Sequence, residues 1–431
     1  MSGFSTPGVY VEELISEPKP ISGASTSIAA FIGSARSGPY NEAVLIGSFS
    51  EFEAIFGGFI SSPRQYLGYA VDMFFKNGGR NAYIVRAAGK EEPAQGQEKA
   101  SMELLDNASA PTTESASVAA TDAGKEDPES ETWIDAETPV DDKLDAPRDF
   151  EAAISALEKV DDASILVVPG ECGADIYDKM ITHCAKMKYR VAILDPKQGL
   201  SIAEVINSRA NEMSSLQGYA AVYYPWLRIV DPITEEIVSV PPSGAVAGVY
   251  ARVDRMRGVH KAPANEELLE LAGLDVQLTN ESQALLNPDG INAIRFIKGS
   301  GNLVWGARTI STDPSRRYVN VCRLLIYLEQ SICNGTQWVV FEPNNENLWS
   351  RVKTTIMEFL RQAWRDGMLV GSVPEDAFYV KCDRTTMNQS NIDSGELIAE
   401  IGVALVKPAD FIVFRITQWC EDIQKNDSLF G

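Results

Sequence analysis

Residues 336–366 have the sequence TQWVVFEPNNENLWSRVKTTIMEFLRQAWRD, in which an expected strand precedes a long amphipathic helix. The run 338–341 is β-branched and aromatic, which favours a strand, and Pro343 ends it. Asn344 or Asn345 then supplies the helix N-cap. Apolar residues recur on one face of this helix, at Leu348, Val352, Ile356, Phe359, Leu360, Ala363 and Trp364. We expect that face to pack on a core.

The opposite face of the same helix carries three arginines. At about 100° per residue, Arg351, Arg361 and Arg365 lie in one arc. The arc also contains Thr354, Thr355, Glu358 and Gln362. Two interpretations are open: a solvated face above a core helix, or a basic ridge that docks an acidic partner.

The chain has 431 residues and a formal net charge of -22. Its length predicts about two or three domains. The acidic balance argues against nucleic-acid binding through a broad basic surface. Residues 90–145 hold sixteen acidic residues against four lysines and are rich in Ala, Ser and Thr. They predict an acidic, low-complexity surface insertion.

The sequence contains no apolar run of about 18 residues, and its start lacks the regions of a secretory signal. We therefore expect synthesis in a bacterial cytoplasm and no membrane insertion. The cysteines form no C-x-x-C pair, which predicts buried or half-buried thiols. They are Cys172, Cys184, Cys322, Cys333, Cys382 and Cys420. With His183 and His260 as the only histidines, a zinc site or a Cys-His nucleophile is not expected.

Strands and helices alternate along much of the chain, which is typical of a parallel α/β sheet. The expected strands are residues 27–33, 44–46, 82–86, 164–168, 190–194 and 219–224. The expected helices are residues 50–57, 66–76, 150–160, 177–188 and 202–214, the first with a capping signature at Ser50. Small residues at 244, 245, 247, 248 and 251 predict a helix that packs closely on a neighbour. Later elements are expected at 293–297, 303–309, 318–333, 377–381 and 398–405.

Parallel sheets often bind nucleotides at their strand ends, through glycine-rich loops that hold the phosphates. Residues 33–38 have the glycine spacing of a Walker loop, but Pro39 stands where lysine is required. Residues 299–301 lack the third glycine of a dinucleotide fingerprint. Neither loop predicts a cofactor.

Both ends of the chain predict extended segments. Residues 8–13 lie between Pro7 and the prolines at 18 and 20, which favour an extended backbone. Residues 410–419 have high β propensity, and such a strand invites pairing with other chains if its edge is open.

Nine segments in the same order resemble the contractile tail sheath proteins of bacteriophages and related extracellular injection particles. They are PGVYVEE at 7–13, FFKNGGRNAYIVR at 74–86, YPW at 224–226, PPSGAVAGVYARVD at 241–254, KAPAN at 261–265, GINAIR at 290–295, VWGART at 304–309, TQWVVFEPNNENLW at 336–349 and KPADF at 407–411. The resemblance covers most of the chain outside residues 90–145.

The resemblance implies an α/β (α+β) multi-domain sheath fold with extended terminal arms. The implied parts are an N-terminal donor arm at 1–22, a central α/β domain at 23–89 and 146–286 with the insertion 90–145, a C-terminal sheath domain facing the tube at 287–409, and a C-terminal donor arm at 410–431. In this family the arms add strands to sheets of neighbouring subunits. The donor residues would be Val9, Tyr10, Val11, Glu12, Phe411, Val413, Phe414 and Ile416.

The implied function is structural, without catalysis or cofactor. Subunits stack as rings of six around an inner tube and contract to drive the tube through a target envelope. The implied partners are further copies of the chain, the inner tube protein, baseplate and tail-terminator proteins, and sheath paralogues, in a phage tail or a released tail-like particle. Arg351, Arg361 and Arg365 would face an acidic tube surface.

Two alternatives remain at this point. The alternating segments at 150–225 are compatible with a nucleotide- or metabolite-binding α/β enzyme. The acidic composition is also compatible with a non-contractile shell or scaffold protein.

Overall fold

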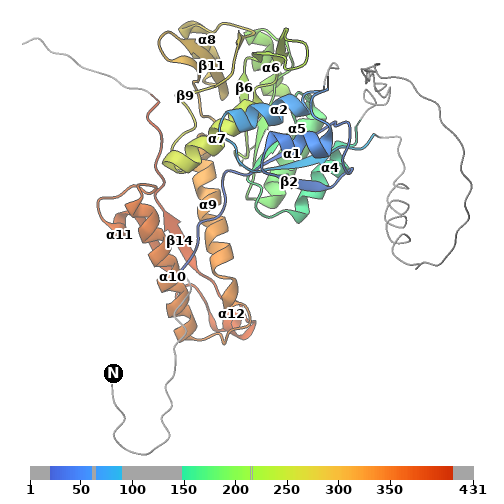
Figure 1. Cartoon of the computed structure of the whole chain (residues 1–431). Coiled ribbons are helices and arrows are strands. Elements are labelled where there is room, and N and C mark those ends of the chain that lie inside the picture. The colour runs from blue at the N-terminus through green and yellow to red at the C-terminus, as the bar shows by residue number, and fades with distance from the viewer. Residues whose placement is uncertain (1–19, 61–64, 90–147, 214, 216, 411–431) are drawn as a thin grey trace, which may run out of the picture. The chain divides into compact units, whose positions relative to one another are not determined.

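The computed structural model describes residues 20–60, 65–89, 148–213, 215 and 217–410 and contains a mostly parallel nine-stranded sheet (Figure 1). The sheet order is β2-β3-β1-β4-β5-β6-β11-β12-β9. The strands are β1 (Ala29–Gly33), β2 (Ala43–Ile46), β3 (Ala82–Arg86), β4 (Ile165–Val167), β5 (Val191–Leu194), β6 (Ala220–Tyr224), β9 (Glu266–Glu267), β11 (Ile291–Ile297) and β12 (Gly301–Val304). The expected α/β fold is confirmed.

The middle of this sheet is parallel and buried on both faces. β1 lies between β3 and β4, with Phe31 opposite Ile84 and Val167. β6 pairs in parallel with β11, and the antiparallel pairs of the sheet are β2–β3, β11–β12 and β12–β9. Because no face of β1, β4, β5 or β6 meets water, these strands are continuous apolar runs, and this made them visible in the sequence.

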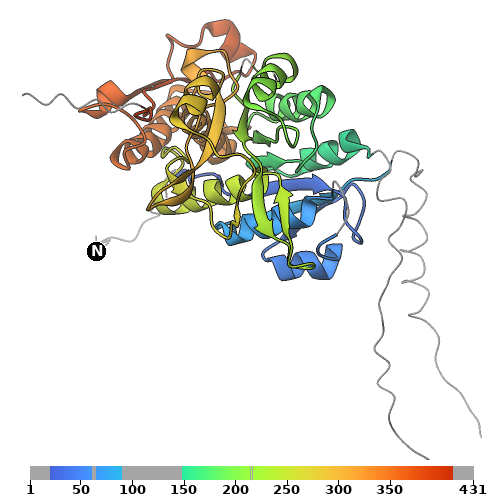
Figure 2. The ribbon, with the colours of Figure 1, turned by 90° about the horizontal axis from the view of Figure 1, so that it is seen from above.

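Helices cover both faces of the sheet. The helical elements of this part of the chain are α1 (Phe49–Phe56), α2 (Leu67–Lys76), α4 (Phe150–Ala156) with η3 (Leu157–Lys159), α5 (Ala174–Met187), α6 (Ile202–Glu212), α7 (Ser243–Arg257), α8 (Asn280–Leu286), η4 (Pro314–Arg316) and α9 (Val319–Gly335). Figure 2 shows α2, in blue, and α5, in green, on opposite sides of the strands. Phe74 of α2 contacts Phe31 edge to face, with ring centroids 5.3 Å apart.

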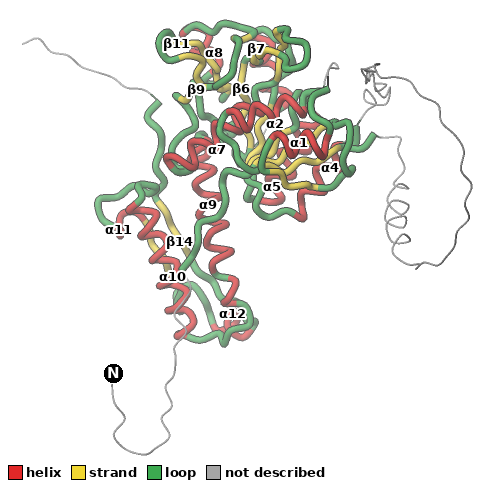
Figure 3. Tube along the Cα trace, in the orientation of Figure 1, coloured by secondary structure: helices red, strands yellow, loops and turns green. Residues whose placement is uncertain are grey.

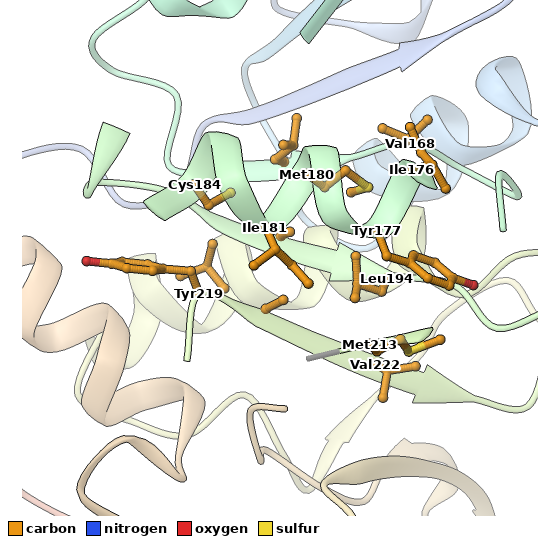
Figure 4. Packing of buried hydrophobic residues seen from close by; sticks show 14 of the residues in the cluster. Val168, Ile176, Tyr177, Met180, Ile181, Cys184, Leu194, Met213, Tyr219 and Val222 are labelled. Carbon is orange, nitrogen blue, oxygen red and sulfur yellow. The ribbon is translucent and has the colours of Figure 1, made fainter. Parts of the chain in front are cut away.

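The face that carries α5 holds a large buried cluster (Figure 4). Ile176, Met180 and Ile181 of α5 pack there with Leu194 of β5 and Val222 of β6. Complete burial of such aliphatic side chains stabilises a fold by about 1.5–3 kcal/mol each. This cluster therefore fixes α5 on the sheet.

The opposite face depends on a close contact between α2 and α7. A Cβ atom added to Gly248 would lie 2.6 Å from the carbonyl oxygen of Phe74, and Gly244 meets the backbone of Ala70 in the same way. Only a residue without a side chain permits such an approach of two helix backbones. The predicted packing role of these small residues is confirmed.

A second, three-stranded sheet has the order β10-β7-β8. Its strands are β7 (Leu227–Val230), β8 (Ile237–Val240) and β10 (Gly273–Leu274), and all neighbours are antiparallel. We did not predict this sheet, because its strands are only two to four residues long.

The described residues divide into two compact units. The larger consists of residues 22–259 and 263–334, and the smaller includes residues 335–410. We expected a C-terminal domain to begin at residue 287, whereas β11 and β12 pair within the nine-stranded sheet and α9 continues in the larger unit up to residue 334. No helix in the described ranges is both long and apolar enough to cross a lipid bilayer.

The smaller unit is built around α10 (Glu346–Arg365) and a two-stranded sheet (Figure 3). Its other elements are η5 (Gln337–Val339), α11 (Pro374–Ala377), β13 (Phe378–Lys381), α12 (Gln389–Asp393) and β14 (Glu400–Val403). β13 and β14 are antiparallel, with Phe378 opposite Val403 and Lys381 opposite Glu400. The strands predicted around 377–381 and 398–405 are confirmed.

The strand predicted at 338–341 is wrong. Backbone hydrogen bonds between near neighbours, such as Val339 N to Thr336 O at 3.0 Å, close this run into the 3-10 turn η5. Phe341 then adopts a left-handed backbone with φ 68°. β propensity requires a neighbouring strand to be realised, and the described part of the chain places none beside this run.

Two local predictions also need correction. The N-cap of α1 is Ser48, whose hydroxyl accepts from the amide of Glu51, and not Ser50. Cys333, in the last turn of α9, is exposed, whereas the other described cysteines are buried or half-buried thiols.

Candidate assembly surfaces

The long helix α10 begins as the sequence predicts. The side chain of Asn345 accepts the amide of Leu348 at 3.0 Å, and Glu346 occupies the first turn, where the helix dipole favours a carboxylate. The indole of Trp349 donates to Asn344 Oδ1 at 2.6 Å. The start of α10 is therefore fixed by its own asparagines.

The apolar face of α10 packs inside the smaller unit. Its buried predicted members are Leu348, Val352, Ile356, Leu360 and Ala363, and Phe359 and Trp364 are half-buried. β13 lies against this helix with Phe378 and Val380 turned inward. Burial of this face orients the opposite face of α10 away from the unit's own core.

The three predicted arginines do not share one environment. Arg351 is half-buried, and its guanidinium lies 4.7 Å from the ring centroid of Trp338, so a cation–π contact holds it inside the unit. Arg361 and Arg365 are exposed, and no described residue hydrogen-bonds or ion-pairs with either guanidinium. The structure thus leaves two of the three arginines accessible.

The exposed arc is also narrower than predicted. Thr355 is 2 % exposed and donates its hydroxyl to Arg351 O at 2.9 Å, so its placement on a solvated face is wrong. It lies at the margin of the arc, where the helix turns toward the core. Glu358 and Gln362 are exposed as expected.

In the described part of the chain β13 and β14 each have a single strand neighbour, so β14 is unpaired on its outer side up to Val403. Directly after β14, residues 368–370 pair with residues 404–406, with Val370 N donating to Ala404 O at 2.8 Å. The amide of Ala404 donates to Ala377 O, which continues the ladder and sets its phase. By the alternation of a strand, Ile401 and Val403 then direct their backbone N–H and C=O groups to the outer edge of β14. Such an edge can accept an added strand.

The outward face of this small sheet is closed by local contacts. The ring of Tyr379 covers Gly402, its partner across the ladder, and its hydroxyl donates to Glu400 Oε1 at 2.8 Å. The ammonium of Lys381 lies 5.1 Å from the same ring. These contacts stiffen the sheet, and among the described residues the unpaired backbone is the outer side of β13 and that of β14 up to Val403.

The predicted donor residues lie outside the described residues. This applies to Val9, Tyr10, Val11, Glu12, Phe411, Val413, Phe414 and Ile416. The acceptor positions on β14 were not named from the sequence, although the alternation at 398–405 contained the signal.

The carboxyl edge of the large sheet is where an α/β enzyme would hold its ligand. Here Asp195, 2 % exposed, accepts the Ser243 amide at 3.0 Å, the Ser243 hydroxyl at 2.5 Å and the Gly170 amide at 3.1 Å. Burial raises the pKa of this carboxyl to about 6, although the three hydrogen bonds lower it. The protein's own carboxylate thus occupies the anion position at the start of α7.

No group of three His, Cys, Asp or Glu side chains able to hold a metal ion occurs among the described residues. Two features of the smaller unit therefore remain as candidate assembly surfaces. They are the exposed arginines of α10 and the unpaired edges of β13-β14.

Comparison with protein families gives two adjoining matches. Residues 146–310 match the phage tail sheath protein central domain, and residues 311–418 match the phage tail sheath C-terminal domain. The tail sheath protein of Burkholderia phage BcepMu is 24% identical over 222 residues, which make up 48% of this chain and 46% of that protein. The chain thus spans about half the length of this curated relative.

Solved sheath structures match over nearly the whole chain. The sheath of an extracellular contractile injection system, PVC, in its contracted state is 30% identical with a TM-score of 0.72, covering 98% of this chain and 99% of that chain. The contracted helical sheath of the anti-feeding prophage is 28% identical with a TM-score of 0.71, covering 96% of this chain and 100% of that chain. The chain therefore belongs to the family of contractile tail sheath proteins, the structural subunits of phage tails and of extracellular contractile injection systems.

Proposed function

We propose that this chain polymerises as stacked six-subunit rings around an inner tube and contracts to drive that tube through a target envelope. The observation that carries the proposal is the full-length similarity to the contracted PVC sheath at 30% identity. Baseplate and tail-terminator proteins contact the two ends of the polymer, and sheath paralogues are built into the same sheath. The subunit is made in a bacterial cytoplasm and released as part of a tail-like particle.

In this proposal the arms tie neighbouring subunits together. The donor segments around Val9–Glu12 and Phe411–Ile416 each add a strand to a β13-β14 sheet of another copy. The unpaired edges of that sheet support this assignment. When a neighbouring subunit covers such an edge, its backbone N–H and C=O groups need hydrogen-bond partners, and an added strand supplies them. A strand linked through backbone hydrogen bonds stays attached while subunits rotate.

The tube contact is assigned to Arg361 and Arg365, with Arg351 as a supporting residue. Exposed ion pairs contribute about 0–1 kcal/mol each, so they can hold an acidic tube surface and still release it. Contraction draws its free energy from contacts that differ between the two arrangements of subunits. A small gain per subunit is multiplied along the polymer, and no hydrolysis by this chain is required.

The arm assignment can be tested by negative-stain electron microscopy of the recombinant chain. We expect the full chain to form tubes, and a variant lacking residues 1–18 to remain a folded monomer. Ile401→Pro gives a second, finer test: its missing N–H lies on the open edge of β14, so the internal ladder stays intact while an added strand is blocked. Normal tubes from both variants would refute the donor-strand assignment.

The tube contact requires co-expression with the tube protein of the same particle. We expect the double variant Arg361→Glu/Arg365→Glu to lose extended sheath around the tube, because its charges would repel an acidic surface. Lys407→Glu, an exposed charge reversal elsewhere in the smaller unit, is the matched control. If the double variant still forms extended sheath around the tube, Arg361 and Arg365 do not contact the tube and are solvated surface residues.

A further inference from the structure

The hairpin β7–β8 carries aliphatic side chains on a face that is exposed to solvent, where polar side chains are expected. One face is buried, with Leu227, Ile229 and Val240 at most 3% exposed. The other face meets solvent, and near its base it is polar as expected: Arg228 and Ser239 both donate to Asp275 Oδ1, at 3.0 and 2.6 Å. An outward face that continued this pattern would be polar to its tip.

The tip is aliphatic instead. Val230 and Ile237 are directly opposite in the ladder and are 55% and 64% exposed, and Ile233 in the connecting turn is 49% exposed. Directly opposite side chains of an antiparallel pair lie about 5 Å apart, so the first two form one surface. We call Val230, Ile233 and Ile237 the tip patch. Positions that break binary patterning without a structural reason are expected at functional surfaces.

The turn that carries the tip patch is held in one geometry. Asp231, 2% exposed, accepts the Tyr69 hydroxyl at 3.1 Å, the Ile233 amide at 3.0 Å and the Thr234 hydroxyl at 2.9 Å. Its own amide donates to Glu236 O at 2.8 Å. Because the turn is already ordered, a partner that covers the patch does not have to order it, which favours binding.

The neighbouring strand edge is open as well. β8 is the last strand of the order β10-β7-β8, and no described residue pairs along its outer side. Exposed aliphatic side chains beside an unpaired strand edge are a surface that natural proteins cover or protect. The tip patch and the edge of β8 form one continuous candidate for contact.

We propose that the tip patch, together with the edge of β8, contacts a second copy of this chain in the sheath, an inference that rests on the proposed function. The solved sheaths that match 96–98% of the chain are polymers of such subunits. Every copy carries the same net charge of -22, so long-range electrostatics oppose self-association. Burial of aliphatic side chains offsets this repulsion without adding charge, and the tip patch contains no ionisable side chain, although Glu235 and Glu236 of the same turn are exposed beside it.

Photo-crosslinking identifies the occupant directly. The chain with p-benzoylphenylalanine in place of Ile237 is assembled, irradiated and analysed by gel electrophoresis and peptide mass spectrometry. We expect a product of twice the 47.0 kDa subunit, joining position 237 to a peptide of another copy. A crosslink within one chain, for example to residues 90–147, or to a different protein would overturn the proposal.

A charged substitution supplies the second test. We expect Ile237→Lys to melt as the parent chain does and to reduce the number of tubes at least tenfold. Leu285→Lys on α8, which is 59% exposed and outside the tip patch, is the matched control and should assemble normally. Parent-like tubes from Ile237→Lys, or equal loss in the control, would overturn the proposal. Failure of the unmodified chain to form tubes would instead refute the proposed function, and the tip contact with it.

Discussion

Arg323 of α9 and Asp254 of α7 form a buried two-bond ion pair, with Nη1 to Oδ1 at 2.9 Å and Nη2 to Oδ2 at 2.6 Å. Both side chains are 3% exposed. Nη2 of Arg323 also donates to Thr26 O at 2.7 Å, and the guanidinium lies 4.7 Å from the ring centroid of Tyr250. One cation thus joins α9, α7 and the segment that enters β1.

Removal of one member of this pair should be strongly destabilising. We expect Asp254→Ala to lower the free energy of unfolding by about 3–5 kcal/mol, because it leaves a buried guanidinium unpaired. Urea denaturation followed by circular dichroism measures the change. The double variant Arg323→Met/Asp254→Leu removes both charges and should recover much of the loss. A single variant as stable as the parent would show that the pair has no structural role.

The close approach of α2 and α7 predicts the effect of a single methyl group. Gly248→Ala should destabilise the chain by about 1–3 kcal/mol, because the added Cβ meets backbone atoms that cannot rotate away. This is the net change, because the packing cost is partly offset by the roughly 1 kcal/mol that alanine gains over glycine in a helix. Gly273→Ala in β10 is the control, since nothing lies within 4 Å of its added Cβ. Equal melting temperatures for the two variants would contradict the packing argument.

The buried pair His183 and Arg190 predicts a pH dependence of stability. Arg190 Nη1 lies 2.7 Å from His183 Nε2. Burial and the neighbouring guanidinium lower the pKa of His183 from 6.5 to about 4. The unfolded chain therefore binds the additional proton between pH 6.5 and 4. The His183 contribution to stability is complete above pH 6.5 and is lost as pH falls through this window, by about 1.4 kcal/mol per pH unit.

The variant His183→Gln isolates this contribution. Its amide oxygen can still accept from Arg190, but it does not titrate. We expect the stability difference between parent and variant to shrink steadily from pH 6.5 to 4, as measured by urea unfolding at each pH. Asp195 contributes the opposite slope in both proteins, because its raised pKa favours the folded state at low pH, and the difference cancels it. A pH-independent difference would rule out a neutral, buried His183.

The exposed Phe341 predicts a stabilising substitution. Its side chain is fully exposed and its backbone is left-handed, a conformation that costs a residue with a side chain about 1 kcal/mol. We expect Phe341→Gly to raise the free energy of unfolding by a similar amount, whereas Phe341→Ala, which retains the Cβ, should not. Differential scanning calorimetry distinguishes the two. A stabilised alanine variant would place the effect in the ring and not in the backbone.

Local sequence determined the elements of this protein wherever one face or both faces of an element are buried along its whole length. The parallel strands β1, β4, β5 and β6 are uninterrupted apolar runs, and α10 carries its cap and its periodic face within one stretch. The glycines of α7 marked a close helix contact for the same reason. The ordered segments also identified the sheath family.

Contacts distant in sequence could not be predicted in this way. Strand order decided that β6 lies beside β11, with Val222 opposite Ile291. The run 338–341 has the composition of a strand but lacks a neighbouring strand in the described residues, so it turns. Short strands such as β7 and β8 leave too little periodicity for recognition.

For the candidate assembly surfaces, too, local sequence predicts one part and the tertiary structure decides the other. Residues 336–366 by themselves placed three arginines on one side of a helix, and helical geometry makes that arc unavoidable. Only the tertiary structure decided that Trp338 covers Arg351 while Arg361 and Arg365 remain exposed. The sequence determines which side chains share a face, because helical periodicity is local. Which of them reach solvent depends on what packs against that face, and packing is settled only when distant segments meet.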